Sequence, residues 1–169
     1  MEYKLFGLLA ENIDPDKIEK EAVGLAIVYS QNIKKGPYVI FAANEGYNAI
    51  YNPGGTKEEG ETDFETLKRE LKEELNLELS KISKEYITTY AYSPKKNTYF
   101  EVRSYVGIVN GTISLNPTEI ESALIFKYKD VDENLLRWLN KKYLLGPSVI
   151  DCFIMKRQEL EKIIASFRP

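Results

Sequence analysis

The chain has 169 residues, enough for one domain that buries about two-thirds of its unfolded surface. Its 43% hydrophobic and 29% charged residues are typical of a globular protein, and a net charge of −3 argues against a nucleic-acid partner. One cysteine excludes an intrachain disulfide and a thiolate zinc cluster, and the absence of histidine excludes Ser-His-Asp and Cys-His catalytic sites.

The N-terminal segment before residue 22 lies outside the predicted core. Its first ten residues are too short and too interrupted for a signal peptide, and no apolar run approaches the roughly 18 residues that span a bilayer. We therefore expect a cytoplasmic protein without a membrane partner.

The apolar side chains of this N-terminal segment are Leu5, Phe6, Leu8, Leu9 and Ile13. Because they need cover, we expect a homodimer, with folding back onto the same chain as the alternative.

Three strands are predicted next, followed by the tight loop Asn52-Pro53-Gly54-Gly55. The first strand is apolar and rich in β-branched residues, which indicates burial on both faces. The predicted strands are residues 22–29, 38–43 and 47–51.

The first predicted helix begins after Glu61. Thr62 and Glu65 have the spacing of a capping box, and Asn76 tolerates the left-handed conformation that ends many helices. Between them an apolar stripe has helical spacing, formed by Phe64, Leu67, Leu71 and Leu75.

The remaining pattern completes a single α/β domain, residues 1–169. Further strands are predicted at 86–92, 99–109 and 123–128, and helices at 130–144 and 148–167. The sequence contains no internal repeat or linker.

Three glutamates of the first helix form an acidic cluster. Glu70, Glu73 and Glu74 fall within an arc of roughly 100° beside the apolar stripe. Like charges at this spacing weaken a helix by a few tenths of a kcal/mol per pair, unless a hard cation such as Mg²⁺ lies among them. Gly54-Gly55 lets a backbone carbonyl approach such an ion. The alternative interpretation is an acidic face exposed to solvent, in which Arg69 pairs with Glu65 or Glu73.

The same stretch resembles the Nudix box, Gly-x5-Glu-x7-Arg-Glu-U-x-Glu-Glu-x-Gly-U, where U is aliphatic. The matching residues, in register, are Gly55, Glu61, Arg69, Glu70, Leu71, Glu73, Glu74 and Leu77. One position departs from the pattern, because Asn76 replaces the last glycine.

The resemblance implies a Nudix-type α/β/α sandwich around a mixed β-sheet, with an extra C-terminal helix. It implies metal-dependent hydrolysis of a nucleoside diphosphate linked to another group, with Mg²⁺ as cofactor and Mn²⁺ able to substitute. It assigns the metal to Glu70, Glu73, Glu74 and the Gly54 carbonyl, and makes Arg69 a supporting residue of the catalytic site.

Some family members take a general base from a later loop, where this chain has Glu119 and Glu121. For either residue alone, an ordinary loop carboxylate is the slightly favoured interpretation. Tyr92 and Arg103 are candidate substrate contacts, and Ser93-Pro94 weakly favours an ADP-ribose-like substrate. The alternatives are a dinucleotide polyphosphate, a nucleoside triphosphate, an RNA cap or end, or a non-catalytic nucleotide sensor.

Overall fold

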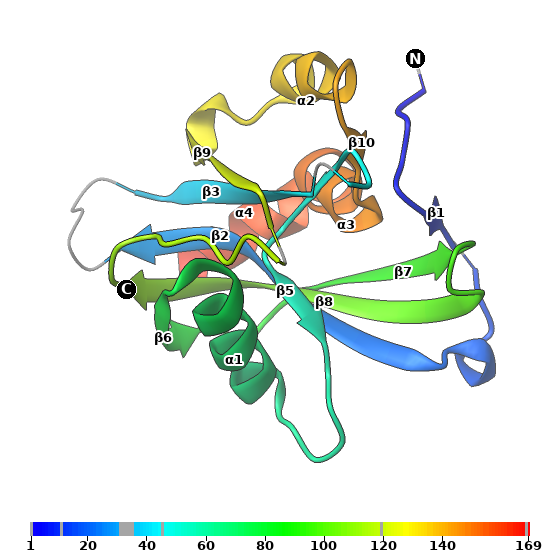
Figure 1. Ribbon diagram of the computed structural model, residues 1–169, viewed down its shortest axis with the longest axis horizontal. Helices are drawn as coiled ribbons and strands as arrows, with labels where there is room; N and C mark the ends of the chain where they lie inside the picture. The colour runs from blue at the N-terminus through cyan, green and yellow to red at the C-terminus, as the bar shows by residue number, and fades with distance from the viewer. Residues whose placement is uncertain (1, 11, 31–35, 45, 119, 168) are drawn as a thin grey trace.

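A mixed β-sheet forms the centre of the computed structural model (Figure 1). The structure describes residues 2–10, 12–30, 36–44, 46–118, 120–167 and 169. The strand order is β1-β7-β8-β2-β3-β4-β10, with β5 beside β2, β6 beside β8 and β9 beside β3. Strands β2 and β8 pair in parallel, as do β4 and β10, whereas the other pairs are antiparallel. The predicted mixed sheet is therefore confirmed.

Helix α1 separates two runs of strands, β2 to β5 and β6 to β9, and the other α-helices follow β9. The strands are β1 Leu8–Leu9, β2 Lys20–Ser30, β3 Tyr38–Asn44, β4 Ala49–Tyr51, β5 Gly54–Thr56, β6 Glu78–Ile82, β7 Ile87–Ser93, β8 Thr98–Asn110, β9 Ser122–Lys127 and β10 Leu144–Leu145. The helices are α1 Asp63–Leu75, α2 Glu133–Asn140, α3 Pro147–Ile150, a π-helical turn Asp151–Met155 and α4 Arg157–Ser166. Short 3₁₀ turns occupy Pro15–Lys17 and Tyr128–Asp130.

Helix α1 covers one face of the sheet. Its predicted capping box is confirmed, because Thr62 Oγ1 accepts from the Glu65 amide at 3.2 Å while Glu65 Oε2 accepts from the Thr62 amide at 2.8 Å. Asn76 ends the helix in the left-handed conformation, with φ 57°. The buried side of α1 packs on β2 and β8 through Leu67, Leu71 and Leu75. This packing fixes the acidic side of the helix relative to the sheet.

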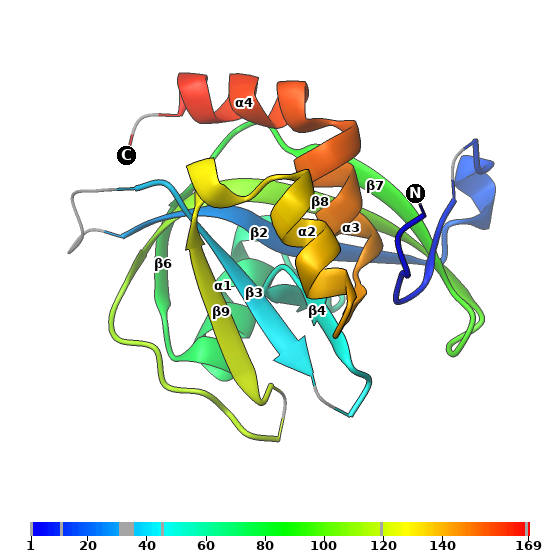
Figure 2. The same ribbon diagram turned by 90° about the horizontal axis from the view of Figure 1, so that it is seen from above.

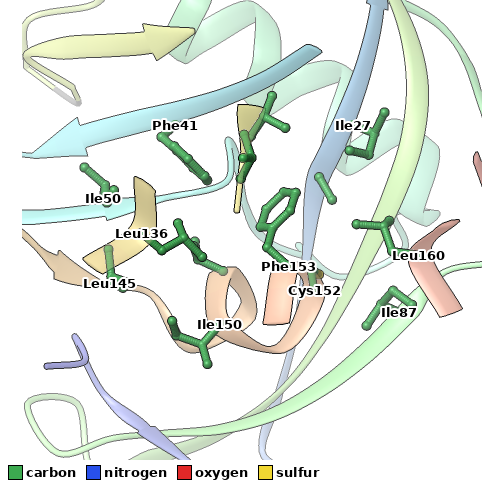
Figure 3. Packing of buried hydrophobic residues seen from close by; sticks show 14 of the residues in the cluster. Ile27, Phe41, Ile50, Ile87, Leu136, Leu145, Ile150, Cys152, Phe153 and Leu160 are labelled. Atoms are coloured by element: carbon green, nitrogen blue, oxygen red, sulfur yellow. The ribbon is translucent and has the colours of Figure 1, made fainter. Parts of the chain in front are cut away.

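Helices α2, α3 and α4 cover the opposite face (Figure 2). Figure 3 shows the core between them, in which Phe41 and Ile27 of the sheet lie close to Phe153 and Cys152 of the π-helical turn. The α/β/α sandwich with a C-terminal helix is thus confirmed.

Two predicted helices differ from the structure. The helix expected over 148–167 is interrupted, because Lys156 leaves the helical conformation and its amide bonds to the Asp151 carbonyl at 2.7 Å. The helix expected over 130–144 ends at Asn140, because Leu144 turns to pair with β4 and donates to Asn48 O at 2.7 Å. At Leu144 a long-range hydrogen bond replaces the continued helix, whereas at Lys156 the bond is the local i→i−5 bond of a π-helical turn.

The N-terminal segment folds back onto its own chain. Leu8 and Leu9 pair with β7, opposite Tyr92 and Ala91, and the Phe6 amide donates to Leu145 O at 2.8 Å. The same chain therefore partly covers these apolar residues except Leu8, which is 54% exposed, and the homodimer stays a prediction. In the described ranges, no helix is long and apolar enough to cross a membrane.

Candidate active site

Helix α1 places the buried glutamate of the acidic cluster against strand β5. Glu74 is only 4% exposed, and its Oε1 accepts a hydrogen bond from the Gly54 amide at 3.4 Å. Burial of a carboxylate is costly unless polar partners or a cation compensate for the lost hydration. The position of Glu74 therefore indicates a role beyond a solvated surface charge.

Glycine is required at both positions of β5 that face this region. A Cβ on Gly54, whose φ is 152°, would lie 2.0 Å from Val23 O, because β5 pairs closely with β2. A Cβ on Gly55 would lie 2.3 Å from Glu70 Oε1. The two glycines thus allow the carboxylates of α1 to contact the backbone of β5 directly.

Arg69 holds the other acidic residues of the box in place. Its guanidinium forms a two-pronged pair with Glu61, at 2.8 Å from Nε to Oε1 and 3.1 Å from Nη2 to Oε2. A third nitrogen, Nη1, lies 2.8 Å from Glu70 Oε1 and 3.5 Å from Glu73 Oε2. Hydrogen bonds from Arg69 and then from Thr66 lower the pKa of Glu61 to about 2. Glu61 therefore stays ionised and orients Arg69 toward the two glutamates.

The residues present fit a hard divalent cation by their chemistry. Glu70, Glu73 and Glu74 offer carboxylate oxygens, and the glycines leave no side chain between Glu70 and the backbone of β5. Within the described ranges, no three acidic side chains already converge as a cation site. Glu70 and Glu73 instead converge on Arg69 Nη1, so cation binding requires their side chains to turn from it.

A cavity of about 430 Å³ adjoins Gly54 and Gly55. Its volume is within the range of small-molecule sites. The cavity is lined by the end of β7, Tyr92 and Ser93, and by Pro94 and Lys95 of the turn that follows. Tyr92 also packs on Tyr99, with ring centroids 4.6 Å apart.

The cavity is also lined by residues that were not predicted from the sequence to belong to a site. Tyr47 and Phe6 line it with rings whose centroids are 5.4 Å apart, and Lys95 Nζ lies 3.7 Å from the centre of the Tyr47 ring. Asn52 lines it as well, although the tight loop Asn52-Pro53-Gly54-Gly55 gave no indication beyond a turn. Phe6 and Tyr47 are far apart in sequence, so only the fold brings them together.

Arg103 lies in a buried ion-pair network away from this cavity. Its guanidinium contacts both oxygens of Asp63, at 2.6 and 2.8 Å, and also Glu21 at 2.8 Å and Glu101 at 3.1 Å. The hydrogen bonds from Arg103, and then from Tyr105, hold the pKa of Asp63 well below its usual range. These contacts join α1 to the sheet. A substrate contact by Arg103 stays a prediction that the network does not favour.

The two candidate bases cannot both be placed. Glu119 lies outside the described residues. Glu121 is exposed just before β9, and its amide donates to Ala43 O at 3.0 Å. A role for either residue as general base stays a prediction.

Comparison with known proteins adds a family to this geometry. The family model described as the NUDIX domain matches residues 23–145. An uncharacterized Nudix hydrolase from Nostoc sp. is 31% identical over 91 residues, which cover 52% of this chain and 49% of that relative. The match therefore spans about half the length of the curated relative.

Solved structures share the fold at low sequence identity. The solution structure of the E. coli ORF135 protein has a TM-score of 0.59 and 17% identity, covering 88% of this chain and 97% of that chain. The crystal structure of a MutT NUDIX hydrolase from Burkholderia pseudomallei has a TM-score of 0.55 and 16% identity, covering 73% of this chain and 96% of that chain.

Proposed function

The chain belongs to the Nudix family, and on this premise we propose that it hydrolyses a diphosphate bond in a nucleoside diphosphate linked to another group. The observation that carries the proposal is the position of Glu70 and Glu74 against the Gly54-Gly55 strand, which borders a cavity of nucleotide size. The carboxylates supply the hydrolytic site and the cavity supplies room for the substrate.

We propose a divalent cation as cofactor, Mg²⁺ with Mn²⁺ able to substitute, held by Glu70, Glu73, Glu74 and the Gly54 carbonyl. Such a cation neutralises diphosphate charge and lowers the pKa of a bound water when it is present. Arg69 contacts both Glu70 and Glu73 and so restricts where their carboxylates lie.

The proton from the attacking water needs an acceptor. With no histidine in the chain, a carboxylate is the natural general base. Glu119 and Glu121 are the candidates in the loop before β9, and we propose them on the basis of the family resemblance.

We propose an ADP-ribose-like substrate, with a dinucleotide polyphosphate as the competitor. The cavity extends from β5 to the turn after β7, so a diphosphate near α1 leaves room for a nucleoside beside Tyr92 and Tyr47. Lys95 and Lys96 line the same cavity and add positive charge that favours an anionic substrate. A triphosphate brings further negative charge toward the glutamates, which disfavours it unless more cation binds.

The experiment is a comparison of kcat/KM for ADP-ribose, a diadenosine polyphosphate and a panel of nucleoside triphosphates, each with Mg²⁺ and with Mn²⁺. We expect ADP-ribose or the dinucleotide to be preferred. Preference for a triphosphate by about tenfold or more would overturn the substrate assignment and leave the metal site standing.

A further inference from the structure

We propose that Asn52 recognises the base of the substrate by pairing its side-chain amide with the hydrogen-bonding edge of that base. This inference rests on the proposed function, because it takes the cavity beside β5 to be the nucleotide site. Asn52 is a specificity-determining residue in this account and takes no part in the chemical step.

The side chain of Asn52 is buried without satisfying its polar atoms. The residue is 6% exposed, and within the part of the chain that the structure describes neither Oδ1 nor Nδ2 has a hydrogen-bond partner. An unsatisfied buried amide reduces folding stability, so such groups are rare in native proteins unless a ligand completes them. Asn52 also lines the 430 Å³ cavity, but its two polar atoms each expose less than 1 Å², so a ligand reaches them when the side chain turns toward the cavity.

The backbone around Asn52 is fixed on both sides. Strand β4 precedes it, and the carbonyl of Pro53 accepts a hydrogen bond from the Leu25 amide at 2.9 Å. A Cβ added to Gly24 would lie 3.7 Å from Asn52 Cβ, so the side chain starts close to the backbone of β2. The backbone that carries the amide is therefore held in place, so binding a ligand orders the side chain alone.

An amide suits a base better than it suits a phosphate or an apolar group. Its oxygen accepts and its nitrogen donates, so it matches a heterocycle that presents a donor beside an acceptor, as Asn does with adenine. A phosphate only accepts and would leave Asn52 Oδ1 unsatisfied. The rings of Tyr47 and Phe6 line the same cavity, and aromatic faces stack on any base.

The test measures binding, which does not require hydrolysis. Dissociation constants for AMP, GMP, CMP, UMP and ribose 5-phosphate are determined by calorimetry for the wild-type chain and for Asn52→Leu. Asn52→Ala is the second variant, in case leucine does not fit. Asn140→Leu is the matched control, because the Asn140 amide is fully engaged, with three hydrogen bonds of 2.8 Å to Lys4 and Tyr143.

We expect both Asn52 variants to bind the preferred monophosphate about tenfold more weakly or worse, and ribose 5-phosphate within about twofold of the wild type. Asn52→Leu should melt at the wild-type temperature or higher, since it removes unsatisfied buried polar atoms. Asn140→Leu should melt lower and keep its nucleotide affinity.

Three results would overturn the inference. They are monophosphates that bind no better than ribose 5-phosphate, Asn52 variants with unchanged affinity, and Asn52 variants whose melting temperature falls while binding persists. Base-dependent binding in a chain that hydrolyses no diphosphate would instead overturn the proposed function alone.

Discussion

Two neighbouring glutamates of α1 have different surroundings. Glu74 is buried against β5, whereas the Glu73 side chain is 46% exposed and faces Arg69. The cap and the buried leucines also anchor α1. The proposed role of both carboxylates in cation binding is therefore a prediction that substitution can test.

Glu73→Gln and Glu74→Gln should each lower kcat by about two orders of magnitude or more, because each removes a charge from the proposed cation site. Melting temperatures should stay at or above the wild-type value, since repulsion within the cluster falls. Turnover and thermal melts measure the two effects. Glu78→Gln, which alters an exposed pair with Lys72, is the control and should keep wild-type turnover. Near-normal kcat in both cluster variants would mean that the acidic side of α1 is only a surface.

Glu61 gives a prediction about pH. Its pKa is lowered to about 2 by Arg69 and then Thr66, so its stabilising contribution is fully present above the ordinary carboxylate pKa of about 4.3 and is lost as the pH falls toward 2. Glu61→Gln should therefore be less stable than the wild type at pH 7, and the difference should shrink below about pH 4. Denaturant unfolding at several pH values measures this. A difference that is constant from pH 7 to pH 2.5 would contradict the assigned pKa.

The position of a single residue could be predicted only where the sequence contains a periodic pattern or a motif with fixed spacing. Glu61 and Arg69 stand at fixed spacing from Gly55, and the structure joins Glu61 to Arg69. Asn52 has no such pattern, because its burial depends on β2 packing beside it. Arg103 is 40 residues from Asp63, so its ion pair was invisible in the sequence.

Among the elements, the N-terminus of α1 is joined to the sheet by ion pairs and hydrogen bonds. Asp63, the first residue of the helix, bonds to Arg103 and to Tyr105 of β8, and Lys57 Nζ lies 3.0 Å from its Oδ1. The side chains of Arg103 and Asp63 are 9% and 16% exposed. Loss of either charge leaves the other largely desolvated.

Asp63→Asn should lower the free energy of unfolding by about 3 kcal/mol, because the Arg103 charge loses its main partner while remaining buried. Equilibrium denaturation checks the value. The double variant Asp63→Asn with Arg103→Met should cost less than the sum of the two single variants, since they share one interaction. Strict additivity would show that the pair contributes nothing as a pair.

Long elements with a strong pattern were predictable, whereas some short strands, such as β5 and β10, were not. Strands β2, β3 and β8 and helix α1 follow the predicted ranges because alternation, apolar runs and caps act locally. Strand β5 is only Gly54–Thr56 and exists because β2 lies beside it. The break at Lys156 depends on a hydrogen bond to Asp151, which no helical periodicity reveals.

For the whole molecule, the homodimer stays a prediction, which now rests on exposed apolar side chains and not on an unpaired N-terminal segment. The N-terminal segment is paired within the chain, but Leu8, Ile125 and Trp138 are 54%, 52% and 63% exposed. A contiguous apolar patch on the surface favours association, and we predict that these side chains contribute to one. Light scattering at high concentration should give twice the chain mass of 19.4 kDa. A mass of one chain at every concentration would refute the dimer.

We propose that the clustered carboxylates of α1 and a divalent cation together hydrolyse a diphosphate bond. The most direct test is the rate of ADP-ribose hydrolysis in Mg²⁺, in excess chelator, and after Mg²⁺ or Mn²⁺ is restored. We expect the chelator to abolish hydrolysis and either ion to restore it, because no histidine is present and few other routes remain. Hydrolysis that continues unchanged in excess chelator would contradict it.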